Sequence, residues 1–174
     1  MRKSLTLFAA VVALALCAGA AGAQEKRRPS TPEQLRHAVE TATLLENDPL
    51  HKDAKKLREQ LLFFIIQAPD IQVTLCPAVL GDHSNIKGDY ASIITGQLVF
   101  STAKFLIEHP EQAGDNDRTL LAGVEGVLRV YQNIRKAKPK VEIKPLEALL
   151  VKQQAGGLAD SVMAAAAAGC KSQG

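Results

Sequence analysis

The chain contains no tryptophan, and aromatic residues make up only 4% of its 174 positions. A core without large rings has to be built from Leu, Val, Ile and Ala, which suits packed helices. Hydrophobic residues reach 47% and charged residues 22%. That composition can fill a core and argues against disorder, and the length suggests one domain.

Signatures of metal and cofactor chemistry are also missing. The four histidines are dispersed, there is no HExxH or CxxC motif, and no glycine-rich loop that could cradle a phosphate group is present. We therefore predict no metal, no cofactor and no catalytic residue. The histidines are His37, His51, His83 and His109.

The first 23 residues have the layout of a secretory signal peptide. Arg2 and Lys3 form a short basic start, residues 5–16 are apolar, and Ala21-Gly22-Ala23 is a small-x-small cleavage site. The apolar run is too short to span a bilayer comfortably. We expect cleavage near Ala23, no stable membrane insertion afterwards, and a soluble secreted or periplasmic protein.

The net charge is small once the leader is removed. The mature chain keeps 19 basic and 18 acidic residues, a net charge of about +1. A balance so close to neutral gives no reason to expect a nucleic-acid partner.

The chain has three cysteines, and the first, Cys17, lies in the leader. Acylation of Cys17, as in a lipoprotein, is disfavoured because Leu16 stands where a small residue is required. Cys76 and Cys170 remain, and an even pair in an exported protein predicts a disulfide. Two buried thiols are the alternative.

We predict a flexible tether over residues 24–30 and a single all-α domain over residues 31–174, with roughly five to seven helices. The longest predicted helix, residues 89–108, has apolar side chains on most of its sides and should be the buried centre of the bundle. Pro110 stops it. A helix over 118–137 contains Gly123 and Gly126, which we expect where another helix backbone comes close.

The remaining elements follow from capping signals and prolines. Thr31-Pro32 predicts the start of a helix ending near Glu46, and Asp48-Pro49 predicts a second helix ending at Pro69. Ile71–Leu75 alternates as a strand would, but no second strand is evident to pair with it. We therefore predict a short helix there, capped by Asp70 and disturbed at Pro77. Pro145 opens the last helical region.

The loop Gly81–Tyr90 is the richest in functional side chains. Asp82, His83, Ser84 and Asn85 offer an acid, a base, a hydroxyl and an amide. Neighbours in one loop rarely converge as a catalytic triad does. These residue types are also those that turns select, so a turn followed by a helix start is the favoured interpretation.

Two other stretches carry charge. Glu108 with Asp115 or Asp117 could form paired carboxylates for glycoside cleavage. Gly114-Asp115-Asn116-Asp117 resembles the start of a calcium loop, but an EF-hand is excluded because Leu120 stands at the sixth position and Gly126 at the twelfth. Helix capping by Asp115 or Asp117 is favoured. The basic stretch 136–144 fits a solvated helix end, or a docking point for an acidic partner.

The segment GQLVFSTAKFLIEHPEQ, residues 96–112, resembles part of small periplasmic immunity proteins that neutralise cell-wall amidase toxins. It covers less than an eighth of the mature chain, and the cysteine arrangement differs from that family's pattern. The resemblance implies an inhibitor of an envelope enzyme.

These observations favour an exported, non-enzymatic helical protein that binds a protein partner in the cell envelope. One alternative is a small hydrolase of envelope polymer that uses carboxylates or His83. The other is the periplasmic inhibitor of the immunity type. An enzyme would bring His83 or the acids together in a concave pocket, whereas a binding module would expose an apolar patch or groove.

Overall fold

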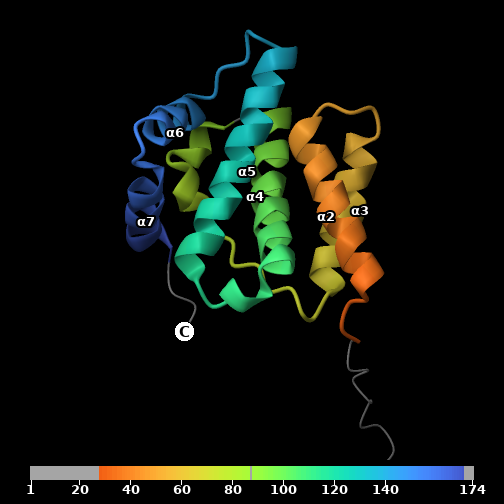
Figure 1. The fold of residues 1–174 in the computed structure, drawn as a ribbon. Coiled ribbons are helices and arrows are strands. Elements are labelled where there is room, and N and C mark those ends of the chain that lie inside the picture. Colours follow the sequence, from red (N-terminus) through yellow and green to blue (C-terminus); the bar gives the residue numbers. More distant parts are fainter. Residues whose placement is uncertain (1–27, 87, 171–174) are drawn as a thin grey trace, which may run out of the picture.

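The computed structural model describes residues 28–86 and 88–170, and the regular elements of this part of the chain are all helices joined by turns and loops, without a strand (Figure 1). The predicted all-α class is confirmed. The predicted leader and most of the tether lie outside the described residues. The α-helices are α2 (Pro32–Asn47), α3 (Ala54–Gln67), α4 (Asp89–Glu108), α5 (Asn116–Ala137), α6 (Lys144–Gln154) and α7 (Leu158–Gly169), and the 3-10 helices are η1 (Pro77–Leu80), η2 (His83–Asn85) and η3 (Pro110–Gln112).

Helices α4 and α5 lie side by side at the centre of the bundle (Figure 1). The pair α2 and α3 covers one side of them, and η1, α6 and α7 cover the other. Apolar side chains fill both spaces, in one cluster around Leu45, Leu61 and Phe100 and another around Val127, Tyr131 and Leu146. The central pair therefore separates two cores.

Helix α4 has the predicted bounds. Gly88 precedes it with φ of 66°, in the left-handed region that glycine adopts without strain, and Pro110 follows its end. By length and composition α4 could cross a bilayer, but Ile94, Leu98 and Phe100 are packed inside the protein. It has the character of a core helix.

The α4–α5 contact depends on two glycines, as predicted. A Cβ atom placed at Gly123 would lie 2.5 Å from Oγ1 of Thr102 on α4. A Cβ atom at Gly126 would overlap the side chain of Ser101. The absence of side chains at these positions lets the two helix backbones approach closely.

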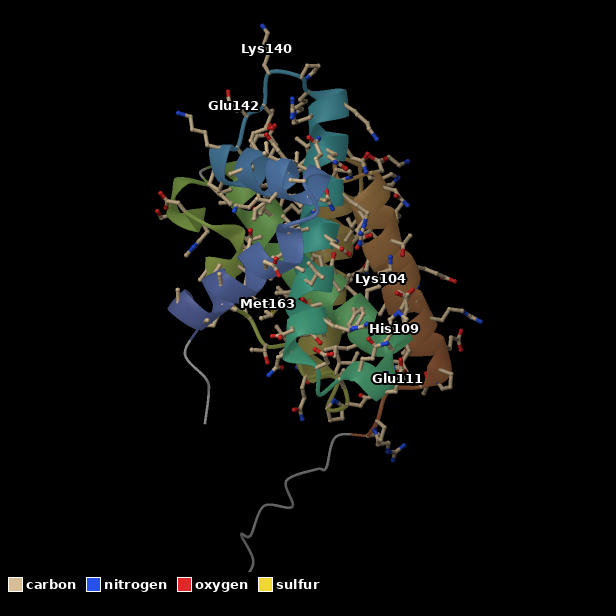
Figure 2. All side chains as sticks on the ribbon, turned by 60° about the vertical axis from the view of Figure 1, so that its left-hand side comes forward. Lys104, His109, Glu111, Lys140, Glu142 and Met163 are labelled. Atoms are coloured by element: carbon tan, nitrogen blue, oxygen red, sulfur yellow. A yellow bond between two sulfur atoms is a disulfide. The ribbon has the colours of Figure 1, made fainter. Side chains whose placement is uncertain are left out.

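Beside this contact lies a buried ionic cluster centred on Glu46, at the end of α2. Its carboxylate accepts a hydrogen bond from Ser101 Oγ at 2.8 Å and another from Arg129 Nε at 3.1 Å. Lys104, which is labelled in Figure 2, places its Nζ 3.4 Å from Oε2 of the same carboxylate. Asn133 Nδ2 donates to the Glu46 carbonyl oxygen at 2.8 Å. Glu46 thus joins α2, α4 and α5 through polar contacts.

The environment of Glu46 favours its charged form. Burial alone would raise the pKa of the carboxyl, but the hydrogen bonds from Arg129 and Ser101, with the positive charges of Arg129 and Lys104, outweigh it. The pKa of Glu46 is consequently held below its ordinary value.

Two elements differ from the prediction. The second helix begins at Ala54 rather than at Leu50, because residues 48–53 form turns closed by bonds such as His51 N–H to the Asp48 carbonyl. No helix follows Asp70 until Pro77. The Asp70 carboxylate accepts hydrogen bonds from the backbone N–H and the hydroxyl of Ser30 instead of capping a helix.

Helix α3 packs on one side only. Its inward residues Leu61 and Ile65 are buried, whereas Leu62, Phe63 and Ile66 are exposed. The apolar run of residues 61–66 is therefore helical, as predicted, but lies at the edge of the bundle, where half of it faces outward (Figure 1).

Replacing Gly126 with alanine should force α4 and α5 apart and lower the free energy of unfolding by about 2 kcal/mol. The matched control is Gly114→Ala, because a Cβ atom there meets nothing within 4 Å. Urea denaturation of both variants measures the effect. Equal stability of the two variants would contradict the proposed close contact.

Glu46→Gln should destabilise the protein by about 2 kcal/mol at neutral pH, since it removes the charge that the cluster pairs. A lowered folded-state pKa stabilises the protein at pH values above the unfolded pKa, and this contribution is lost as the pH falls through the folded pKa. The stability difference from wild type should therefore shrink on acidification. Glu40→Gln, on the exposed face of the same helix, should change little at any pH.

Candidate functional site

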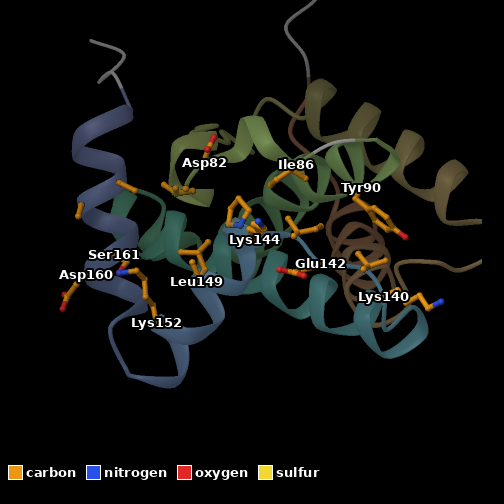
Figure 3. A pocket seen from close by; sticks show the side chains of 18 residues that line it. Asp82, Ile86, Tyr90, Lys140, Glu142, Lys144, Leu149, Lys152, Asp160 and Ser161 are labelled. Carbon is orange, nitrogen blue, oxygen red and sulfur yellow. The ribbon is translucent and has the colours of Figure 1, made fainter.

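A groove of about 1310 Å³ lies on the surface of the described part of the chain. Its walls come from the η1–η2 segment, the connector between α5 and α6, and helices α6 and α7 (Figure 3). Tyr90 and Lys140 lie at one end, and Asp160 and Ser161 lie at the other. Segments around residues 79–90, 140–152 and 160–165 thus share one surface.

The floor of the groove is apolar and its rim is charged. Val79, Ile86, Ile143 and Leu149 lie along the floor and are buried. The charged residues of the rim carry both signs, and they are Asp82, Lys140, Glu142, Lys144, Lys152 and Asp160. A surface of this kind can bury apolar groups of a ligand while the rim orients its charged or polar groups.

Tyr131 holds the connector wall in place from inside the core. Its hydroxyl accepts a hydrogen bond from the Ile143 backbone N–H at 3.0 Å and donates one to the carboxylate of Glu147 on α6. Arg135 adds an ion pair to Glu147 at 2.8 Å. Burial and the bond to Glu147 raise the pKa of Tyr131, so the hydroxyl remains protonated as this geometry requires. Tyr131 is thus buried in the core with its hydroxyl hydrogen-bonded on both sides.

The opposite wall, α7, is held against η1. The structure brings Cys76 and Cys170 together, with their Cα atoms 5.6 Å apart, a separation that suits the predicted disulfide. Next to this pair, a Cβ atom at Gly169 would lie 2.5 Å from Cβ of Ala78. The cysteine pair and this close contact together set the position of α7 beside the groove.

The four candidate residues of the 81–90 loop do not form a catalytic triad. Ser84 Oγ donates to the Asp82 carboxylate at 2.6 Å, while Nδ1 of His83 lies 3.3 Å from the Gly81 carbonyl oxygen. His83 therefore does not stand between the acid and the hydroxyl. Of this loop's candidates only Asp82 lines the groove, and the Asn85 side chain is not among those described.

The candidate carboxylates Glu108, Asp115 and Asp117 are not among the residues that line the groove. Glu108 is exposed near the end of α4, whereas Asp115 caps α5 by accepting the Arg118 backbone N–H at 3.0 Å. Asp115 and Asp117 line an open depression that does not include Glu108. Within the described residues, no group of three or more His, Cys, Asp or Glu side chains is placed to hold a metal ion.

Sequence reasoning missed most of the groove. Lys140, Glu142 and Lys144 belong to the stretch interpreted as a solvated helix end or a docking point for an acidic partner, and all three line the groove. The signal was present in the run KVEIK, residues 140–144, where charged and apolar residues alternate as in an extended segment. The contribution of α7 left no such signal, because it depends on how the helices pack.

No known protein family, curated protein or solved structure matches this chain.

The pairing of Cys76 with Cys170 predicts that neither thiol reacts with a maleimide in denatured, non-reduced protein. After reduction, both should react, and the free energy of unfolding should fall by about 4 kcal/mol, since the bridge closes a long loop. Full labelling of both residues before reduction would exclude the disulfide. Mass spectrometry of the labelled peptides gives the result.

Proposed function

We propose that this protein is an exported, non-enzymatic binding protein of the cell envelope and that it holds a protein partner in the groove between the connector, α6 and α7. The observation that carries the proposal is the groove itself, with its apolar floor and charged rim. Burial of apolar surface in such a groove is the main source of binding free energy, and the rim charges select the partner.

The proposal of export rests on the leader-like sequence of residues 1–23 and on the cysteine pair. Residues 1–23 lie outside the described part of the chain, so the argument for cleavage near Ala23 is one of sequence. A disulfide between Cys76 and Cys170 would suit an oxidising compartment.

The hydrolase alternative receives less support from the geometry. Glycoside cleavage needs two carboxyl groups facing the same bond, whereas Glu108 lies outside the depression that Asp115 and Asp117 line. His83 contacts the Gly81 carbonyl and is not among the residues lining the groove. We therefore favour binding over catalysis.

The immunity-type alternative rests on residues 96–112. In the structure, much of this segment is the second half of α4, where Gln97, Phe100 and Ala103 are buried. The resemblance thus falls largely on positions that pack the core rather than on a surface that could cover an enzyme. No separate inhibitor site is proposed.

Photo-cross-linking in the native cell envelope tests the binding site. A photoreactive amino acid is introduced at Ala148, which lines the groove on α6, and at Val151, which is exposed on the same helix but does not line the groove. We expect a discrete protein adduct from position 148 only. Equal adducts from both positions, or an adduct from position 151 alone, would remove the groove as the binding site.

A further inference from the structure

Residues 141–143 form the connector wall of the groove and lie outside any helix, with extended backbone at Ile143. Ile143 has φ of −120° and ψ of 92°, and the side chains alternate between half-buried Val141, exposed Glu142 and buried Ile143. This alternation is that of a β-strand, where successive residues face opposite sides. Here the segment has no partner strand, because the described chain contains no strand.

The backbone groups of Ile143 are hydrogen-bonded within the protein. The Ile143 N–H donates to the Tyr131 hydroxyl, and the Ile143 carbonyl accepts the N–H groups of Leu146 and Glu147. Successive backbone groups of an extended chain point to opposite sides. The N–H and C=O of Glu142 therefore point away from Tyr131, and they form no hydrogen bond within the described residues. The groove wall thus presents one unpaired donor and one unpaired acceptor.

The charges on the rim favour a ligand that carries both positive and negative groups. Lys140, Lys144 and Lys152 form no ion pair within the described part of the chain. Glu142 and Asp160 add negative charge along the same groove. A lipid with an anionic head and an apolar tail would match only the lysines, whereas a peptide can offer both signs between apolar side chains.

We infer that the groove takes an extended peptide segment of the partner, which pairs its backbone with Glu142 and places alternate apolar side chains on the floor formed by Ile86 and Leu149. This is strand addition to an unpaired edge, in which backbone hydrogen bonds give affinity and the pockets for alternate side chains give specificity. The inference rests on the proposed function, since it names the part of the partner that the groove holds.

The test begins with peptides selected from a random phage-display library on the mature, oxidised protein. A selected peptide is then titrated into ¹⁵N-labelled protein. We expect the amide signals of Val141, Glu142 and Leu149 to shift and the Glu142 amide to exchange more slowly with solvent. Ala148→Arg should weaken binding about tenfold or more by filling the groove, while Val151→Arg should leave it unchanged.

A backbone scan separates strand addition from other modes of peptide binding. Methylating one peptide nitrogen at a time should weaken binding about tenfold at a single position, the nitrogen that donates to the Glu142 carbonyl oxygen, and little at the neighbouring positions, because the wall offers the peptide that one acceptor. Binding that Ala148→Arg abolishes but that no single N-methylation weakens would overturn the backbone pairing.

Two further outcomes separate this inference from the proposed function. In the first outcome, the library yields no peptide whose binding is weakened by Ala148→Arg, while the cross-link from position 148 persists. The peptide inference then fails and the groove remains the binding site. If dodecanoate binds in the groove and no peptide does, the ligand is an acyl chain, and both the inference and the proposed protein partner are overturned.

Discussion

The close contact between α4 and α5 is the constraint on which the rest of the structure depends. At Gly123 and Gly126 the backbone of α5 lies against Thr102 and Ser101 of α4, with no room for another side chain. The short distance between the helices also brings Ser101 and Arg129 to the same carboxylate, that of Glu46. Packing and charge pairing therefore fix one relative placement of α2, α4 and α5.

Helix α5 also connects the centre of the bundle to the groove. On α5, Arg129 faces the buried carboxylate, while Tyr131, two residues later, bonds to the connector at Ile143 and to Glu147 on α6. The groove wall is thus attached directly to the rigid centre of the bundle. If the groove binds a ligand as proposed, a wall supported in this way would lose little conformational freedom on binding, which favours affinity.

Capping residues, glycines and prolines in the sequence predicted those parts of the fold that depend on interactions between neighbouring residues. The capping residue Thr31 accepts the Gln34 N–H, α4 has the bounds set by its flanking glycine and proline, and Gly123 and Gly126 lie at a helix contact. Glu46 was not predicted as buried, since its partner Arg129 is 83 residues away and a charge at a helix end resembles a solvated one. The groove was missed for the same reason: its walls meet only through packing.

The position of Cys170 has a consequence for the order of folding. The residue follows α7, so it is synthesised after every helix described here, while Cys76 emerges before α4. The centre of the bundle can form before α7 is available. The groove, with α7 as one wall, can therefore be completed only after α7 has been synthesised.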